Sequence, residues 1–328
     1  MELELLGNLR GRKQTLWAEL LGKAGLDPDP QVERTALIWD NGQLIATGSR
    51  QGNLLKCIAV EEAWQGEGLT ATLITALRQD AFSEGHRHLF LYTKPQNANQ
   101  FTSLFFYAIA QTSQVLLMEN RQNGIGQFVD SLPVPEQGGV TGAAVMHCNP
   151  FTRGHRYLIE TAAAECDRLY VFVLSEEGGQ FSPEDRMAMV KAGTADLKNV
   201  TVLPTGPYLI SSATFPTYFL KDKDRLPEIQ CELDIAVFIR YFAPKLGITR
   251  RYVGTEPLSA STRQYNQALK QQLPPAGIEV RELPRLELQG GPVSASAVRR
   301  LMAAGDETAL EKLVPETTLK YLKARGYL

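Results

Sequence analysis

The fold of this chain is decided by the stretch Val140-Thr-Gly-Ala-Ala-Val-Met-His-Cys-Asn-Pro-Phe-Thr-Arg-Gly-His155, which continues as Arg156-Tyr-Leu-Ile-Glu-Thr-Ala-Ala-Ala164. The residues from Val140 to Met146 are apolar and β-prone, and after the turn Asn149-Pro150 an Ala-rich helical pattern begins near Gly154. A helix that starts above a strand directs unpaired backbone N–H groups and the positive end of its dipole at whatever lies there. The stretch therefore predicts an anion site suited to a polyphosphate.

Three residues of this predicted loop and helix carry the chemistry. Gly154 lets a ligand approach the backbone, and His155 in the first helical turn can donate a hydrogen bond to phosphate oxygens. Thr152 can add a hydroxyl donor from the loop. The pattern Thr152-x-Gly154-His155 resembles the (His/Thr)-x-Gly-His signature of the nucleotidyltransferase superfamily. That resemblance implies cleavage of ATP or CTP between the α and β phosphates.

A second motif lies far downstream, at Val293-Ser-Ala-Ser-Ala-Val-Arg299, and it resembles the Ile-Ser-Ser-Thr-x-Ile-Arg element of the same superfamily. Either Ser294 or Ser296 is expected to cap a helix. Arg299 on that helix could reach the β and γ phosphates with its guanidinium fork. The sequence departs from the pattern at Ala295, where a hydroxyl is lost, whereas Ser296 keeps one.

Composition and charge limit the class of protein. A length of 328 residues suggests two domains, and 44% hydrophobic with 21% charged residues is typical of a globular protein. With 34 basic and 36 acidic residues the formal net charge is −2, which leaves no basic excess for nucleic acid. The sequence has neither a long apolar run nor the basic start of a signal peptide. We therefore expect a cytoplasmic protein that binds neither nucleic acid nor a membrane.

The four cysteines show no C-x-x-C spacing, which argues against a zinc site and against a disulfide framework.

The prolines and glycines of Ser131-Leu-Pro-Val-Pro-Glu-Gln-Gly-Gly139 predict the domain joint. We expect a first domain over 1–133, a linker over 134–139 and a second domain over 140–328. Within the first domain, strands at 35–40 and 44–48 flank the turn Asp40-Asn-Gly42 and predict a hairpin.

The first domain also contains a strand, Leu54 to Val60, that leads through a Gly-containing loop into a helix. The loop pattern Gln65-x-x-Gly68-x-Thr70 resembles the coenzyme A pyrophosphate loop of the GCN5-related acetyltransferase fold, (Arg/Gln)-x-x-Gly-x-(Gly/Ala). Two departures follow in this domain. By spacing, Phe101 stands where many such enzymes place a tyrosine general acid, and Phe105 replaces a glycine. Because phenylalanine cannot donate a proton, a fold kept for architecture or docking is favoured over catalytic acetylation.

Between the two nucleotide motifs, the second domain alternates strands with helices. A buried strand is predicted at 169–174, and Ser182-Pro-Glu-Asp185 is typical of a capped helix start. Further strands are expected at 199–203, 251–254 and 278–283. The fold class is therefore α/β: an acetyltransferase-like α+β domain followed by a Rossmann-like, doubly wound parallel sheet that binds its ligand at the carboxyl ends of the strands.

Two further stretches narrow the resemblance to one family. Tyr208-Leu-Ile-Ser-Ser-Ala-Thr-Phe-Pro-Thr-Tyr-Phe-Leu-Lys221, and Tyr252-Val-Gly-Thr-Glu-Pro257 with Gln264-Tyr-Asn266, are similar to the citrate lyase ligase family. The resemblance extends over essentially the whole chain, including the order of the two domains. It implies that acetate attacks the α-phosphate of ATP to give acetyl adenylate and pyrophosphate. The acetyl group then passes to the thiol of a coenzyme A-like prosthetic group on the acyl carrier subunit of citrate lyase, which switches the lyase on.

The resemblance also implies roles for individual residues. His155 and Thr152 would stabilise charge at the α-phosphate, and Arg299 would hold the departing phosphates, which a Mg²⁺ ion neutralises. No Asp or Glu cluster predicts the ligands of that ion, so we expect ATP and water to hold most of it. The ATP site would further include His147, Asn149, Pro150, Gly154, Gly254, Ser294 and Ser296.

Two further ligand contacts are hypotheses, and three alternative functions remain open. Ser211 and Lys221 are candidates to contact acetate or a phosphate. The loop residues Gln65, Gly66 and Gly68 are candidates to dock a pantetheine or pyrophosphate group. The alternatives are an acetyl coenzyme A-dependent N-acetyltransferase, an adenylyltransferase that makes a dinucleotide cofactor, and a non-catalytic binding protein.

Overall fold

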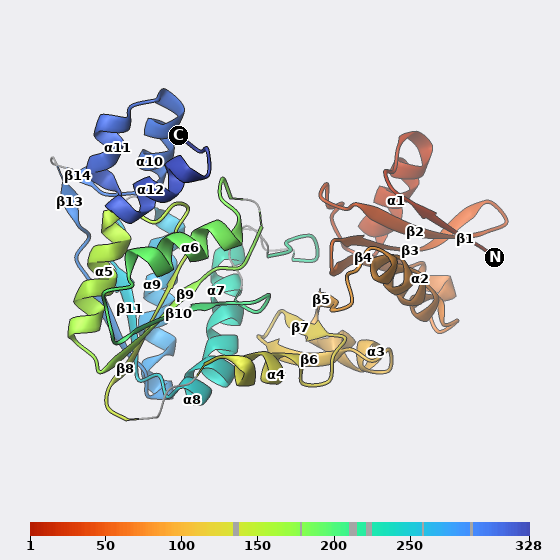
Figure 1. Cartoon of the computed structure of the whole chain (residues 1–328). Helices are drawn as coiled ribbons and strands as arrows, with labels where there is room; N and C mark the ends of the chain where they lie inside the picture. The colour runs from red at the N-terminus through yellow and green to blue at the C-terminus, as the bar shows by residue number, and fades with distance from the viewer. Residues whose placement is uncertain (134–137, 178, 210–214, 221–224, 258, 289–290) are drawn as a thin grey trace. The chain divides into compact units, whose positions relative to one another are not determined.

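The structure, a computed structural model, describes all residues except 134–137, 178, 210–214, 221–224, 258 and 289–290. It divides the chain into two compact units (Figure 1). Unit 1 comprises residues 1–125 and 215–229, and unit 2 comprises residues 126–214 and 230–328. Unit 1 therefore includes a short segment that returns from within the second half of the sequence. Ser211 and Lys221 lie outside the described residues.

Unit 1 is built on a seven-stranded sheet in the order β1-β2-β3-β4-β5-β7-β6. All neighbouring strands are antiparallel except β4 and β5, which are parallel. The main elements are β1 (Glu2–Leu6), α1 (Gly11–Lys23), β2 (Arg34–Asp40), β3 (Gln43–Gln51), β4 (Leu54–Val60), α2 (Leu69–Ser83), β5 (Phe90–Thr93), α3 (Ala98–Thr102), β6 (Tyr107–Gln111) and β7 (Leu116–Glu119). Short 3-10 turns lie at η1 (Glu62–Trp64) and η2 (Pro95–Asn97).

The predicted hairpin is confirmed as β2 and β3. Its turn residues Asn41 and Gly42 have φ angles of 47° and 79°, which is the backbone that Asn-Gly adopts readily in a two-residue hairpin turn. Helix α2 packs closely on this sheet, because a side chain on Gly48 would meet Leu77 at 3.1 Å. The core between sheet and helix is formed by aliphatic residues such as Ile45, Leu73 and Leu77.

Unit 2 contains a five-stranded parallel sheet in the order β10-β9-β8-β11-β12. Its elements are β8 (Thr141–Met146), α5 (Arg153–Ala164), β9 (Arg168–Val173), α6 (Pro183–Gly193), β10 (Val200–Pro204), β11 (Arg250–Gly254), α9 (Ala260–Gln272), η5 (Pro274–Ala276), β12 (Glu279–Leu283), β13 (Glu287–Leu288), β14 (Gly291–Pro292), α10 (Ala295–Ala304), α11 (Glu307–Leu313) and α12 (Glu316–Ala324). Helix α4 (Gly124–Ser131) precedes this sheet, and α7 (Leu226–Val237), a π-helical turn η4 (Phe238–Phe242) and α8 (Ala243–Leu246) precede β11.

This sheet confirms the predicted doubly wound architecture. The strand order reverses between β8, which continues to β9 and β10 on one side, and β11, which continues to β12 on the other. Such a switch point leaves a crevice at the carboxyl ends of the two central strands, where α/β proteins bind their ligands. The predicted phosphate loop follows β8 directly. Figure 1 shows α10, α11 and α12 gathered at one end of unit 2, where Val298, Leu310 and Val314 form a small separate core.

Candidate functional site

Helix α5 begins with a reciprocal cap that orients His155. Thr152 is the N-cap residue, and its Oγ1 accepts a hydrogen bond from the His155 backbone N–H at 3.3 Å. In return, the Thr152 backbone N–H donates to Nδ1 of the His155 ring at 3.1 Å. The Thr152 hydroxyl is buried and lies 3.0 Å from the same Nδ1. Thr152 thus contacts both the backbone N–H and the ring Nδ1 of His155, and these contacts fix the orientation of the ring.

This cap decides the protonation of His155. Because Nδ1 accepts the Thr152 N–H, the neutral ring carries its proton on Nε2. Burial, followed by the nearby charges of Arg285 and His147, lowers the pKa of His155 to about 4. The imidazole is therefore neutral at pH 7, and its Nε2–H has no hydrogen-bond partner among the described residues. His155 lines a cavity into which this group could donate.

The two sequence motifs meet at the start of this helix. A side chain on Gly154 would lie 3.1 Å from the Val293 carbonyl oxygen, so any larger residue would force the backbone of the downstream motif to shift. Ser294 is the residue that caps α10, since its hydroxyl accepts from the Ala297 N–H at 3.2 Å. Arg299 Nη1 donates to the Asn149 carbonyl oxygen at 2.5 Å. The structure thus links residues about 150 positions apart around one loop.

The meeting point encloses a cavity of about 250 Å³. Of the residues predicted for nucleotide binding, the lining includes His147, Thr152, Gly154, His155, Gly254 and Ser294. Asn149, Pro150, Ser296 and Arg299 lie outside the lining and belong to the surrounding loop and helix. Among them, Ser296 Oγ lies 3.1 Å from Ser294 Oγ on the exposed side of the cap.

Buried polar contacts hold the loop in shape. The Asn149-Pro150 peptide bond is cis, and the Asn149 side-chain oxygen accepts the Phe181 N–H at 3.2 Å. Arg186 is fully buried beneath the loop and donates to the His147 carbonyl oxygen at 3.4 Å. The His147 ring is exposed and lies 3.4 Å from Glu176. Although one side of the ring is open to solvent, its partial removal from water and the charge of Arg186 lower the pKa of His147, so this second histidine is also mostly neutral near pH 7.

Two arginines in the cavity wall were not predicted from the sequence. Arg251 of β11 is 3% exposed, and its guanidinium lies 4.8 Å from the centre of the Phe238 ring. Arg285 follows β12 and pairs with Glu256 at 3.1 Å. The one signal for Arg251 was a charged residue at the first position of the predicted strand 251–254. Arg285 gave no signal, because it follows the predicted strand in a short polar connection.

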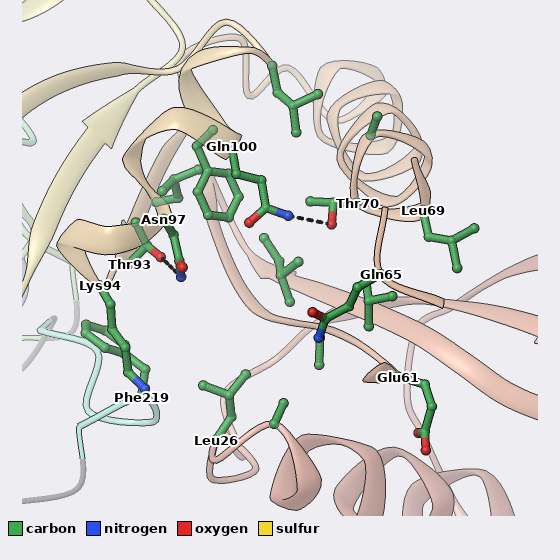
Figure 2. Close-up of a pocket in the computed structure, with 18 of the residues that line it drawn as sticks. Leu26, Glu61, Gln65, Leu69, Thr70, Thr93, Lys94, Asn97, Gln100 and Phe219 are labelled. Carbon is green, nitrogen blue, oxygen red and sulfur yellow. Dashed lines mark hydrogen bonds between the residues drawn. The ribbon is translucent and has the colours of Figure 1, made fainter. Parts of the chain in front are cut away.

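Unit 1 has a larger cavity of about 1050 Å³, drawn in Figure 2. Its lining includes the predicted docking residues Gln65, Gly66 and Gly68 at the start of α2. Gly66 and Gly68 have φ angles of 92° and 74°, a backbone that favours glycine. In Figure 2 the Thr70 hydroxyl points toward Gln100 and accepts its side-chain N–H at 2.9 Å. Thr70 is therefore bonded across the cavity wall rather than left free.

The two phenylalanines noted in the sequence have different surroundings. Phe101 lines the cavity but packs into the core of unit 1 and is 5% exposed. Phe105 has a φ of 63° and is 66% exposed. Its left-handed backbone is the conformation that glycine adopts most easily, which agrees with the prediction that Phe105 replaces a glycine.

The strands β4 and β5 diverge beside this cavity. They pair only at Leu54 with Phe90 and at Leu55 with Leu91. The gap between them receives Tyr218 from the returning segment, whose hydroxyl donates to the Tyr92 carbonyl oxygen at 3.4 Å. The same hydroxyl interacts with the backbone of Cys57 in β4, and burial raises the pKa of Tyr218 far above its usual value. Tyr218 thus bridges two strands that do not pair there.

The described part of the chain contains no group of three or more His, Cys, Asp or Glu side chains placed to hold a metal ion. None of its helices combines the length and the apolar character needed to span a membrane.

Comparisons with known proteins match both halves of the sequence to known families. Residues 141–322 match the model of the citrate lyase ligase C-terminal domain, and residues 11–107 match that of the acetyltransferase (GNAT) family. The chain is 41% identical over 321 residues to citrate (pro-3S)-lyase ligase of Escherichia coli K12, covering 95% of this chain and 91% of that protein. It is 44% identical over 286 residues to the protein of the same name from Klebsiella pneumoniae, covering 85% and 84%. The Haemophilus influenzae protein of that name is 39% identical over 324 residues, covering 96% of each chain. On these matches, the chain belongs to the citrate lyase ligase family.

Proposed function

We propose that this protein is an acid-thiol ligase that activates acetate with ATP and acetylates the prosthetic-group thiol of citrate lyase, thereby activating the lyase. The observation that carries the proposal is the His155 side chain at the start of α5. Thr152 fixes the ring so that its Nε2–H can donate into a cavity closed by the second motif. We assign adenylation to the second domain, 140–328, and acceptor docking to the first, 1–133, with 134–139 as linker.

In the first half-reaction, a carboxylate oxygen of acetate attacks the α-phosphorus of ATP. The new P–O bond forms as the bond to the β-phosphate oxygen breaks, and pyrophosphate leaves. Negative charge grows on the α-phosphate oxygens, where the N–H groups at the start of α5 and the His155 Nε2–H stabilise it. Thr152 acts through His155 as a positioning residue, since its hydroxyl is engaged in the cap.

Arg299 and a metal ion would act on the leaving group. Arg299 lies on α10, next to the phosphate loop, with one nitrogen bonded to the Asn149 carbonyl and the rest of its fork available for the β and γ phosphates. Mg²⁺ would enter with ATP and neutralise these phosphates. Phosphate oxygens and water would supply most of its ligands, since the described residues offer no carboxylate cluster.

In the second half-reaction, the acceptor thiol, as thiolate, attacks the acetyl carbonyl carbon. A C–S bond forms, the bond to the phosphate oxygen breaks and AMP leaves, while the thiol proton goes to solvent. We propose that the cleft of unit 1 docks the pantetheine part of this acceptor. The backbone at Gly66 and Gly68 can approach a phosphate, and Lys94 contributes a cation to the same lining.

Two observations disfavour the rival N-acetyltransferase activity for unit 1. Phe101 offers no proton to a leaving thiolate and is packed in the core. Tyr218 fills the gap between β4 and β5. If the purified chain transferred acetyl groups from acetyl coenzyme A without ATP, the N-acetyltransferase function would be favoured again.

The second rival, an adenylyltransferase that makes a dinucleotide cofactor, could use the same His155 site. The acceptor distinguishes the two, so the deciding experiment is exchange of labelled pyrophosphate into ATP by the purified chain with Mg²⁺. We expect exchange with acetate and none with pantetheine phosphate. Exchange with the phosphorylated acceptor alone would move the protein to the cofactor adenylyltransferases. No exchange with either would favour a non-catalytic binding protein.

A further inference from the structure

Arg251 is a buried cation without enough partners. Its side chain is 3% exposed, and its Nε and Nη1 atoms make no hydrogen bond to the described residues. The Phe238 ring at 4.8 Å offers a cation–π contact, which is weaker than an ion pair with full hydrogen bonding. A guanidinium removed from water and left unpaired destabilises the fold strongly. Such a residue is expected to have a partner that binds from outside the chain.

The surroundings of Arg251 show where that partner would bind. Arg251 is one of the residues that line the cavity of about 250 Å³, together with His155 and Gly154. Arg251 belongs to β11, opposite Ala143 of β8, so it comes from the strand across the switch point from the phosphate loop. No ion pair joins Arg251 to a carboxylate in the described part of the chain. The neighbouring Asp234 is engaged instead by the Tyr265 hydroxyl at 2.6 Å.

We infer that Arg251 binds the carboxylate of the acid substrate and holds it for attack on the α-phosphorus. This inference rests on the proposed function. The reaction brings two anions together, a carboxylate and a phosphate, and a fixed guanidinium beside them offsets their repulsion. Apolar wall residues such as Val145, Leu158 and Val253 would face the alkyl group. The small cavity then selects a short acid.

The test compares Arg251→Gln with Arg251→Lys and with a control on the same strand. The control is Arg250→Gln, because Arg250 is outside the cavity lining and pairs with Glu279 at 2.8 Å. Pyrophosphate exchange measures the KM for acetate and for ATP separately. We expect Arg251→Gln to raise the acetate KM by about 10- to 100-fold, the value of a lost charged hydrogen bond, and to change the ATP KM little. Arg251→Lys should recover part of the loss, and Arg250→Gln should behave as wild type.

A second measurement does not depend on turnover. Sodium acetate alone should raise the melting temperature of the wild-type chain by binding the folded state, and this shift should vanish in Arg251→Gln. Removing an unpaired buried cation should not lower the melting temperature without acetate, as loss of a structural ion pair would. A raised ATP KM with an unchanged acetate KM would instead assign Arg251 to a phosphate and overturn the inference. So would an acetate shift that persists in Arg251→Gln. If the wild type shows the shift but no acetate-dependent exchange, the proposed function fails and the carboxylate site stands.

Discussion

In the proposed mechanism His155 would act as a neutral hydrogen-bond donor, because its own helix cap fixes the tautomer. Thr152 supplies the N–H that Nδ1 accepts, and burial with the Arg285 charge lowers the pKa of His155 to about 4. A protonated ring would bind the phosphates more strongly in both the ground state and the transition state. A neutral N–H instead contributes a directed hydrogen bond where charge develops.

The first prediction concerns the His155 side chain. His155→Ala should lower the rate of acetate-dependent pyrophosphate exchange by about 100- to 1000-fold, the loss typical of one oxyanion donor. The measurement is exchange at saturating ATP and acetate. His86→Ala serves as the control, because His86 lies in unit 1 outside the described cavities. Near-wild-type exchange by His155→Ala would remove this residue from the mechanism.

The second prediction concerns Asp185, which holds the end of the chain. Burial raises its pKa, but hydrogen bonds from Tyr327 and Tyr321 outweigh this effect and lower the pKa to about 2. Because the folded pKa is below the unfolded value of about 4, Asp185 stabilises the fold above pH 4, and this contribution disappears as the pH falls from 4 to 2. Asp185→Asn should lower the free energy of unfolding at pH 7 by about 2 kcal/mol.

Urea unfolding at pH 7 and at pH 3 tests that prediction. The difference between wild type and Asp185→Asn should shrink at the lower pH. Glu316→Gln is the control, since Glu316 is exposed on α12 and pairs with the exposed Lys320. A difference that is independent of pH would mean that packing, rather than the charge of Asp185, stabilises this end of the chain.

At the scale of elements, α5 shows how one helix start serves both stability and chemistry. Its N-cap residue Thr152 satisfies a backbone N–H and orients the His155 ring at the same time. Gly154, two residues later, admits the Val293 backbone of the second motif. The start of α5 is therefore constrained by two contacts: the Thr152 cap within the helix, and the Val293 backbone packed against Gly154.

The third prediction separates these roles of Thr152. Thr152→Ala should destabilise the protein by about 1 kcal/mol, as loss of an N-cap does. It should also reduce the exchange rate, because the Nδ1 contact loosens. Thr152→Ser keeps the hydroxyl and should restore both properties. If Thr152→Ala lost stability but kept the full rate, the hydroxyl would serve the helix alone.

At the scale of the whole molecule, the chain does not divide into two continuous halves. Residues 215–229 belong to unit 1, although they follow β10 of unit 2 in sequence. Within unit 1 this segment places Tyr218 between β4 and β5, and both Tyr218 and Phe219 line the larger cavity. A wall of the proposed acceptor cleft is thus supplied by the part of the sequence that matches the citrate lyase ligase C-terminal domain.

The fourth prediction tests the proposed acceptor cleft. Gly68→Val adds a side chain at a φ of 74°, inside the cavity lining. It should raise the KM for the acyl carrier subunit at least several-fold and leave acetate-dependent pyrophosphate exchange unchanged. Gly85→Val matches the backbone strain, with a φ of 88°, outside the lining. Equal effects of both variants would attribute the change to strain, and unchanged carrier kinetics would reject docking at this loop.

The sequence by itself determined the local elements and both motifs. Strands β8 to β12, the Asn-Gly hairpin and the helix start at Ser182 follow from apolar runs, turn residues and caps, which act over a few residues. The sequence also predicted that α10 starts at Ser294 or Ser296, and the structure selects Ser294. The tertiary structure decided what depends on distant contacts. It brought Arg299 to the Asn149 carbonyl, placed the buried Arg251 in the lining of the cavity that also contains His155, and brought Tyr218 from late in the sequence into the cleft of unit 1. These placements come from strand order and packing, and no local pattern records which side chains the folded chain leaves without a partner.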